Sequence, residues 1–205
     1  MILSYAITTI AKVKAQLGIT DTSKDSLLET LVNQVTAFAE GFCGGRRFMS
    51  HTVSNEMHDT NGGNNVFLKD FPITALSSVE YRSGSISSPT WNTYSPEGYL
   101  LYADEGYVHF FGKLPTVHQG LRFNYVAGYL IDWAHEDDET KHTLPFDLTG
   151  VATDLVCQMY LGKDNQNISS LSTEGQSVTF ATPDKVITPM QESILGNYIA
   201  YRLTR

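Results

Sequence analysis

The sequence is poor in cysteine, in positive charge and in long apolar runs, and each shortage removes a class of protein. Its 205 residues include two cysteines, Cys43 and Cys157, without the close spacing of a zinc site or disulfide framework, so we expect buried free thiols. Lys plus Arg number 14 against 22 Asp plus Glu, and the net charge of -8 disfavours a protein that neutralises phosphates over a wide surface. No segment approaches the ~18 apolar residues of a membrane helix, and the first ten residues lack the pattern of a signal peptide. We therefore expect no membrane association, and a soluble chain that is made and kept in the cytoplasm.

Motifs of enzyme catalysis are also missing. The chain has no Gly-x-Ser-x-Gly elbow, and neither cysteine has a histidine near it in sequence. The glycines from Gly41 to Gly45 follow a helical pattern and lack the Lys-Ser or Lys-Thr ending of a phosphate loop, so they indicate a helix stop. We predict that the chain is not an enzyme, with no catalytic residue, no cofactor and no metal.

One polar cluster contains residue types that metals accept. Its members are Asp132, His135, Glu136, Asp137, Asp138, Glu139 and His142. Their spacing matches no metal-binding motif, and runs of charge in proteins are commonly exposed to solvent. We therefore interpret the cluster as a solvated acidic loop, and we rank a metal-dependent hydrolase as the last of the alternatives.

Two stretches near the N-terminus have the period of amphipathic helices. Apolar residues recur at three and four positions from Ile10 to Leu17, after possible caps at Thr8 and Thr9 and before Gly18. A stronger apolar stripe runs over residues 25–42, where Ser26 and Glu29 have the spacing of a capping box. Gly44 and Gly45 end this second helix, because glycine readily adopts the left-handed conformation of a helix end.

Residues 48–129 have a different texture and predict an all-β insertion. Short runs rich in Val, Thr, Tyr and Phe alternate with Gly, Pro, Asn and Ser clusters. Asn61-Gly62 predicts a tight hairpin between strands at 51–57 and 65–68. The other predicted strands cover residues 76–82, 99–103, 107–111 and 121–126.

Helical patterns return at Pro145, a good first-turn residue, and run to about Leu161. Residues 164–185 are polar and too long for an ordinary connection, so they predict a functional arm or a flexible loop. Thr188, Pro189 and Gln191 then open a last helix. A single helical pair cannot bury its apolar stripe alone, so we expect Leu31 and Val35 to meet Val151 and Leu155 in a small bundle.

These elements predict an α+β fold, a small bundle of about four helices with an inserted antiparallel β domain and a C-terminal arm plus helix. Residues 1–47 and 144–205 are expected to form the bundle with the arm and terminal helix. Residues 48–143 are expected to form the inserted β domain. We expect the two parts to make one structural unit overall.

Several short sequence segments, taken in their order along the chain, resemble those of a known protein family. They are Asp25-Ser26-Leu27-Leu28, Phe42-Cys43-Gly44-Gly45-Arg46-Arg47-Phe48, Phe71-Pro72-Ile73, Tyr125-Val126-Ala127-Gly128-Tyr129, and Leu144-Pro145 with Asp147-Leu148 before a helix ending near Tyr160. Over residues 23–161 the chain is similar to the head-tail connector (adaptor or head-completion) proteins of tailed bacteriophages and related prophage or gene-transfer particles. The physical reasons for two phrases concern the fold: a strand leaves its sheet at Ala127-Gly128-Tyr129, and Phe71 must be extended before Pro72.

The resemblance implies a structural protein of the virion neck, between capsid portal and tail, made in the bacterial host. It implies a homo-oligomeric ring of about twelve subunits packed head to tail. The implied partners are the portal protein, a stopper or tail-completion protein, and double-stranded DNA that passes through the channel without sequence-specific binding.

Analogy with this family suggests residues that contact the portal, and a pair of basic residues suggests a contact between subunits. The terminal helix is our candidate for portal binding, through Pro189, Ile194, Leu195, Tyr198, Ile199, Arg202 and Arg205. Arg46 and Arg47 form the only adjacent basic pair. We interpret them as a surface pair that caps helix-end carbonyls, or as a subunit interface through a salt bridge to the neighbouring copy.

Two alternatives remain besides the hydrolase. The chain could be a stopper or tail-completion protein of the same particle. It could instead be a carbohydrate-binding module that uses the aromatic residues of the β insertion. These aromatic residues are Trp91, Tyr94, Tyr99, Tyr102, Tyr107, Phe110 and Phe111, which at strand spacing are more typical of a core and of cross-strand pairs.

Overall fold

The computed structural model describes residues 2–85, 87–163, 170–173, 176–179 and 187–199. The chain forms two compact units, and the second is inserted into the sequence of the first. The helical unit contains the residues up to Gly45 and from Leu144 to Ile199, and the β unit contains Arg46–Thr143. Helices and antiparallel sheets are thus both present, which confirms the predicted α+β fold.

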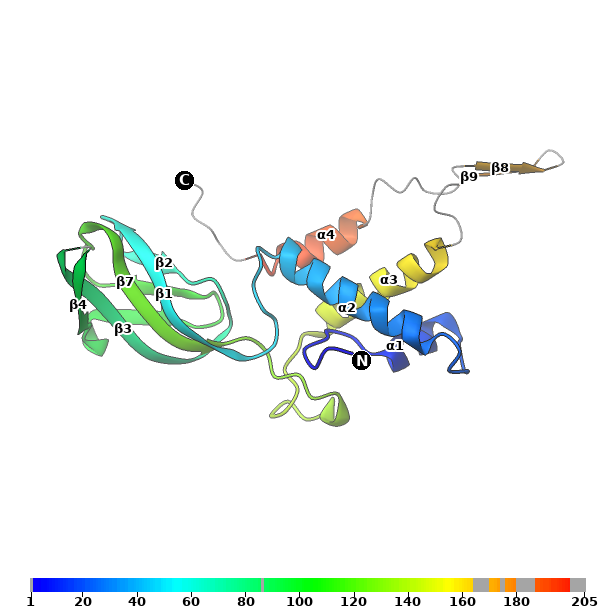
Figure 1. The fold of residues 1–205 in the computed structure, drawn as a ribbon, viewed down its shortest axis with the longest axis horizontal. Helices are drawn as coiled ribbons and strands as arrows, with labels where there is room; N and C mark the ends of the chain where they lie inside the picture. The colour runs from blue at the N-terminus through cyan, green and yellow to red at the C-terminus, as the bar shows by residue number, and fades with distance from the viewer. Residues whose placement is uncertain (1, 86, 164–169, 174–175, 180–186, 200–205) are drawn as a thin grey trace. The chain divides into compact units, whose positions relative to one another are not determined.

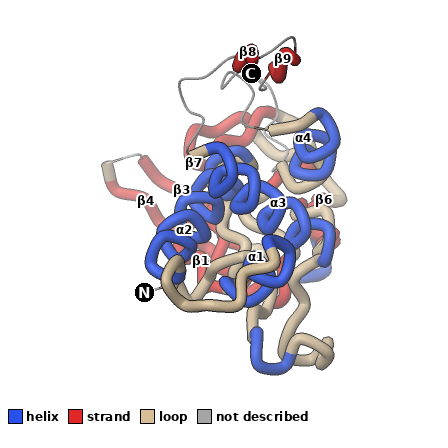
Figure 2. Tube along the Cα trace, turned by 90° about the vertical axis from the view of Figure 1, so that its right-hand side faces the viewer, coloured by secondary structure: helices blue, strands red, loops and turns tan. Residues whose placement is uncertain are grey.

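The described part of the helical unit has four α-helices. They are α1 (Ile10–Leu17), α2 (Asp25–Phe42), α3 (Phe146–Gly162) and α4 (Pro189–Gly196). Helix α2 packs against α3, and the two lie side by side in both views (Figure 1; Figure 2). Leu31, Val35, Val151 and Leu155 are all buried, as expected for residues that close a small bundle. Among these helices, none has the length and apolar character needed to span a bilayer.

Local chemistry explains most of the helix ends. The Thr9 side chain accepts a hydrogen bond from the Lys12 amide at the start of α1, and Gly18 ends that helix with φ 69°. The predicted capping box of α2 is wrong, because the helix begins at Asp25 and Ser26 already lies in its first turn. Lys24 occupies the cap position of α2 and makes no side-chain capping bond.

Helix α4 has a true capping box but is shorter than expected. Thr188 and Gln191 exchange hydrogen bonds between their side chains and backbone amides. The amides of Asn197, Tyr198 and Ile199 bond to carbonyls three residues earlier rather than four, so the α-helix gives way to a tighter turn. Residues 200–205 of the predicted helix lie outside the described residues.

The described part of the β unit contains seven strands in two antiparallel sheets. They are β1 (His51–Asn61), β2 (Asn65–Phe67), β3 (Ile73–Ser85), β4 (Ser88–Thr93), β5 (Tyr99–Tyr102), β6 (Tyr107–Phe110) and β7 (Thr116–Ala127). The larger sheet has the order β1-β7-β3-β4, and the smaller sheet has the order β2-β6-β5. The sequence missed β4, a polar strand that contains Pro89 and pairs with β3 at the edge of its sheet.

The predicted hairpin around Asn61-Gly62 is wrong in its pairing. The turn itself is present, with Gly62 at φ 85° and the Asn61 side chain accepting a hydrogen bond from the Gly63 amide. However, β1 pairs with β7 and β2 pairs with β6, so the turn carries the chain from one sheet to the other. Turn chemistry is local, whereas the choice of strand partner depends on contacts far apart in sequence.

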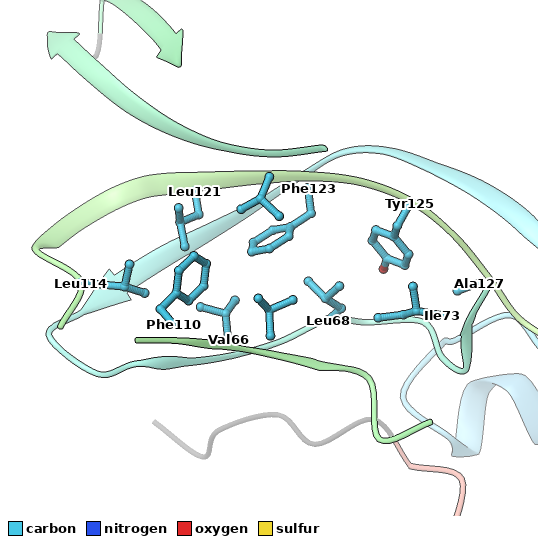
Figure 3. Packing of buried hydrophobic residues seen from close by; sticks show 11 residues of the cluster. Val66, Leu68, Ile73, Phe110, Leu114, Leu121, Phe123, Tyr125 and Ala127 are labelled. Atoms are coloured by element: carbon cyan, nitrogen blue, oxygen red, sulfur yellow. The ribbon is translucent and has the colours of Figure 1, made fainter. Parts of the chain in front are cut away.

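The apolar core of the β unit lies between its two sheets, as Figure 3 shows. Its buried residues are Val66, Leu68, Ile73, Val79, Val108, Phe110, Leu114, Leu121, Phe123, Tyr125 and Ala127. Alternate residues of β7 point inward, so Leu121, Phe123 and Tyr125 fill the space opposite Val66 and Phe110 of the smaller sheet.

Gly128 ends β7 for a steric reason. Its φ is 104°, and a Cβ at this position would lie 2.7 Å from the Met49 carbonyl oxygen and 2.8 Å from that of Phe48. The Tyr129 amide bonds to the same Phe48 oxygen. A small residue where this strand leaves the sheet was predicted, and the close backbone approach supplies the reason.

Part of the predicted C-terminal arm is described. Strands β8 (Ser170–Thr173) and β9 (Gln176–Thr179) pair in antiparallel register. The rest of residues 164–185 lies outside the described residues, so the functional role expected for the arm stays a prediction.

Candidate assembly surfaces

The outer side of the smaller sheet carries aromatic and uncharged residues. Val66, Val108 and Phe110 point into the core, so the residues that alternate with them point outward. We call this outward surface the aromatic face. It consists of Asn65, Phe67, Leu100, Tyr102, Tyr107 and His109.

The strand register arranges the aromatic face in two rows. Phe67 and Tyr102 are both cross-strand partners of Tyr107, and the Tyr102 and Tyr107 rings stack with centroids 4.4 Å apart. The centroids of Phe67 and Tyr107 are 5.3 Å apart. In the second row, Asn65 and Leu100 flank His109, and His109 Nδ1 lies 2.6 Å from Asn65 Oδ1. Leu100 is 49% exposed and Tyr102 is 37% exposed, so solvent reaches apolar atoms in both rows.

The outer side of the larger sheet is built differently, and we call it the polar face. Arg122 forms an ion pair with Glu80, its cross-strand partner, and the Arg122 guanidinium carbon lies 4.5 Å from the centre of the Trp91 ring. The Asn124 amide donates to the Ser78 hydroxyl at 2.8 Å. The polar face consists of Met57, Ser78, Glu80, Trp91, Arg122 and Asn124. Its outward positions are mostly tied by polar contacts within the chain.

Arg46 lies in the interior of the β unit, so its predicted place in a surface pair is wrong. The side chain is fully buried, and its guanidinium donates to the Phe71 carbonyl. The guanidinium carbon lies 3.5 Å from the centre of the Phe71 ring and 5.2 Å from that of Phe48. A planar guanidinium can be buried when aromatic faces and a carbonyl replace water. Arg47 is exposed, and its role in a subunit interface stays a prediction.

A hydrogen-bond network around the carboxylate of Glu56 lies on the inward side of the larger sheet. Glu56 accepts a hydrogen bond from the Tyr125 hydroxyl, and its Oε1 lies 2.7 Å from His58 Nε2. Burial acts to raise the pKa of Glu56, but the hydrogen bonds from His58 and Tyr125 outweigh it and hold the pKa below its usual value. Burial and the Glu56 carboxylate raise the pKa of Tyr125. Glu56 is therefore ionised, and its hydrogen bonds with His58 and Tyr125 connect β1 to β7 on the inner side of the larger sheet; we call this group the internal brace.

The acidic cluster forms local contacts within its loop. His135 Nδ1 lies 2.8 Å from Asp132 Oδ2, and Lys141 Nζ lies 3.4 Å from Asp138 Oδ2. The buried His142 ring packs 4.6 Å from Trp133. Within the part of the chain that the structure describes, no three His, Cys, Asp or Glu side chains converge as metal ligands would. His135, Asp137 and Glu139 are exposed as predicted for a solvated acidic loop, whereas the prediction is wrong for His142, which is buried.

The seven aromatic residues of the β insertion do not form one platform. Tyr94 packs edge to face with both Tyr99 and Phe110, and the Tyr94 and Phe110 centroids are 5.0 Å apart. Trp91 belongs to the polar face, whereas Tyr102 and Tyr107 belong to the aromatic face. Phe111 is 66% exposed just beyond β6. A small pocket of about 160 Å³ is lined by Tyr81, Tyr94 and Leu121 among others, away from the stacked tyrosines.

The residues predicted to bind the portal have different environments. Leu195 is fully buried in the helical unit, where its carbonyl accepts from the Cys43 thiol, so it cannot be a surface contact in this conformation. Ile194 is half-buried, and the Tyr198 hydroxyl donates to Asp147 at 2.6 Å. Pro189 and Ile199 are exposed. Arg202 and Arg205 lie outside the described residues.

The sequence pattern did not predict two exposed apolar residues of the helical unit. Met190 is 73% exposed in the first turn of α4, and Phe146 is 77% exposed at the start of α3. Each lies at a helix start, where the turn geometry rather than the apolar stripe decides which side chains face solvent. Both cysteines, in contrast, are buried free thiols as predicted.

The uncharged sheet face and the exposed apolar helix starts are surfaces of the kind that make contacts with other macromolecules. Residues 6–201 match the family of the head completion protein. Because this match covers nearly the whole chain, the chain belongs to the head completion protein family. The resemblance found in the sequence is thereby confirmed.

Solved structures of neck proteins share the fold. A chain in the neck of an empty GTA particle matches with 16% identity and a TM-score of 0.57. A chain in the neck of a native GTA particle has 17% identity and a TM-score of 0.54, and one in the virion of a native gene transfer agent (GTA) particle has 17% and 0.50. Each match covers 100% of this chain and 94% of the other. No curated protein matches the chain.

Proposed function

We propose that this chain is a structural subunit of the neck of a tailed phage or phage-like particle, between the capsid portal and the tail. The observation that carries the proposal is the family match over residues 6–201. The GTA neck chains support it, because the fold agrees over 94% of their length. In this proposal the chain has no enzymatic activity and holds no cofactor.

The subunit forms a closed ring of about twelve copies in this proposal. The similar neck of a native GTA particle, computed with C12 symmetry, supports this number, and the C6 symmetry used for the neck of the empty particle is compatible with it. A cyclic ring is head to tail, so each copy offers two different surfaces to its two neighbours. Residues 1–47 with 144–205 act as the helical part of each subunit and residues 48–143 as the inserted domain.

The ring joins the portal on one side and a stopper or tail-completion protein on the other, and double-stranded DNA passes through it. A net charge of -8 suits a channel that DNA crosses without binding, because acidic walls repel phosphates. The portal contact includes Pro189, Ile199 and the exposed Met190, with Arg202 and Arg205 following. Leu195 instead anchors α4 within the helical unit.

Electron microscopy of the purified chain tests the proposal, with and without portal-bearing, DNA-filled heads from the same source. We expect a ring to be added below the portal. Heads that remain undecorated at saturating protein would contradict a neck role and leave only the fold and the family established.

Paired variants test the portal contact. Met190→Glu places a charge at a 73% exposed apolar position of α4, and Leu161→Glu does the same at a 63% exposed position of α3. We expect Met190→Glu to weaken binding to heads roughly tenfold, since a carboxylate would be desolvated against the portal. Leu161→Glu is the matched control and should bind like the wild type. Equal binding by both variants, measured by co-sedimentation with heads, would remove α4 from the portal contact.

A further inference from the structure

We propose that the aromatic face of the β unit is the surface on which the neighbouring copy of this chain packs. This inference rests on the proposed ring and assigns one of the two surfaces that each copy needs. The face consists of six outward positions on three strands, and none of them is Asp, Glu, Lys or Arg.

The composition of this face is unusual for a surface that stays in water. Antiparallel sheets with one solvated face ordinarily alternate apolar inward residues with polar outward ones. The polar face follows this rule on the same sandwich, with an ion pair between Glu80 and Arg122. On the aromatic face the outward row of Phe67, Tyr107 and Tyr102 is entirely aromatic.

Sheet stability alone does not account for the face. Cross-strand aromatic pairs stabilise a sheet, so the stacked Tyr102 and Tyr107 rings have a role within the chain. Leu100, the cross-strand partner of His109, is covered only in part by the sheet and remains 49% exposed. Leu100 and Tyr102 thus expose apolar atoms in both rows of the face, and exposed apolar surface is a mark of contacts with other proteins.

The charge of the chain favours another copy of this chain as the occupant. Each copy has a net charge of -8, so copies repel one another over most of their surface. The six positions of the face carry no carboxylate, and Glu105, which acts on Tyr107, lies at the rim in the turn between β5 and β6, so two acidic copies can meet here without burying a carboxylate of the face. Nucleic acid would require Lys or Arg on the face. A sugar would require free polar groups beside the rings, and Asn65 and His109 instead lie within hydrogen-bond distance of each other.

The neighbouring copy has a suitable second surface. A head-to-tail contact joins two different patches, so the aromatic face needs an apolar complement elsewhere on the chain. Phe146 of the helical unit is 77% exposed, the highest value among the large apolar residues with a described exposure. We therefore place Phe146 on the opposite side of the same interface.

Two charge-introducing variants test the inference. Leu100→Glu puts a carboxylate on the aromatic face at a position that is 49% exposed, and Met57→Glu puts the same charge on the polar face at a position that is 46% exposed. Ring formation on portal-bearing heads is counted by electron microscopy. We expect Leu100→Glu to reduce ring occupancy roughly tenfold or more and Met57→Glu to leave it unchanged. Circular dichroism melting checks that both variants are folded.

The outcomes separate the inference from the proposed function. If the wild-type chain forms no ring, the proposed function fails first. If the wild type and both variants form rings equally well, the ring stands and the assignment of the aromatic face is overturned. If Leu100→Glu rings assemble normally but no longer bind the tail-side protein, the face serves a different partner, which also overturns the inference.

A photo-cross-link covers the case in which Leu100→Glu does not fold. Tyr107 is replaced by p-benzoylphenylalanine, which keeps an aromatic ring at this position. Irradiation of assembled rings should give covalent dimers of this chain, with Phe146 on the cross-linked peptide expected from its exposure. Cross-links only to another protein, or only within one chain, would contradict the contact between copies.

Discussion

The two outer faces of the β unit share one core and differ in chemistry. On the larger sheet, Arg122 pairs with Glu80 and lies over Trp91, so outward side chains satisfy one another. On the smaller sheet, Tyr102 stacks on Tyr107 beside exposed Leu100. Both sheets need only inward apolar residues to form the sandwich. The comparison therefore shows that the outward side chains of the two sheets can differ in chemistry while the inward side chains form one shared core.

The largest expected effect lies in the core beneath both faces. Phe123→Ala removes a fully buried ring between the two sheets and should cost about 3–5 kcal/mol of unfolding free energy. Phe111→Ala removes the same ring from a 66% exposed position and should cost less than about 1 kcal/mol. Urea denaturation followed by circular dichroism measures both. Similar losses from the two variants would mean that Phe111 is covered, and the exposure contrast on which the comparison depends would fail.

A smaller effect is expected at the internal brace of the larger sheet. Because folding lowers the pKa of Glu56, its ionised form stabilises the fold above the ordinary pKa of about 4.5. This stabilisation is lost as the pH falls through the lower pKa of the folded state. Glu56→Gln should cost about 1–3 kcal/mol at neutral pH and should flatten the loss of stability below pH 5.

Thermal unfolding of the wild type and Glu56→Gln from pH 7 to pH 3 measures this effect. The control is Glu97→Gln, which removes an exposed carboxylate of the same unit. Parallel pH profiles for Glu56→Gln and the wild type would show that the carboxylate does not brace the larger sheet.

The smallest expected effect compares polar contacts on the two faces. Glu80→Gln weakens the ion pair with Arg122, whose side chain is 23% exposed, and should cost about 1 kcal/mol or less. Asn65→Ala removes a contact with His109 on the aromatic face and should change stability by less than about 0.5 kcal/mol. Chemical denaturation at low and high salt measures both, and only the Glu80 effect should shrink with salt. A larger loss from Asn65→Ala would mean that the aromatic face also stabilises the subunit through polar contacts.

Much of the fold could be predicted because its signals are local. The apolar period and the terminal glycines gave residues 25–42 for α2, and the structure has Asp25–Phe42. The Thr188 and Gln191 capping box was also visible in the sequence. Helices are stabilised by contacts within a few residues, so their positions are readable from a short window.

The candidate site was much less predictable. Arg46 was placed on the surface because charged residues are seldom fully buried, yet its guanidinium packs on the ring of Phe71, which is 25 residues away in sequence, as well as near the ring of Phe48. Leu195 was assigned to the portal because its helix has an apolar stripe, but the helical unit covers it. The sequence showed the aromatic residues of the β insertion, but it did not show which of them share one face of a sheet.

The sequence by itself determined the α+β class, most of the helix and strand positions and the resemblance to head completion proteins. These depend on periodicity, turn chemistry and local phrases. Only the tertiary structure decided that the Asn61-Gly62 turn switches sheets and that Phe67, Tyr107 and Tyr102 form one outward row. The physical reason is that strand partners are chosen by burial of a shared core over long sequence separations, and a shift of one residue would turn that row inward.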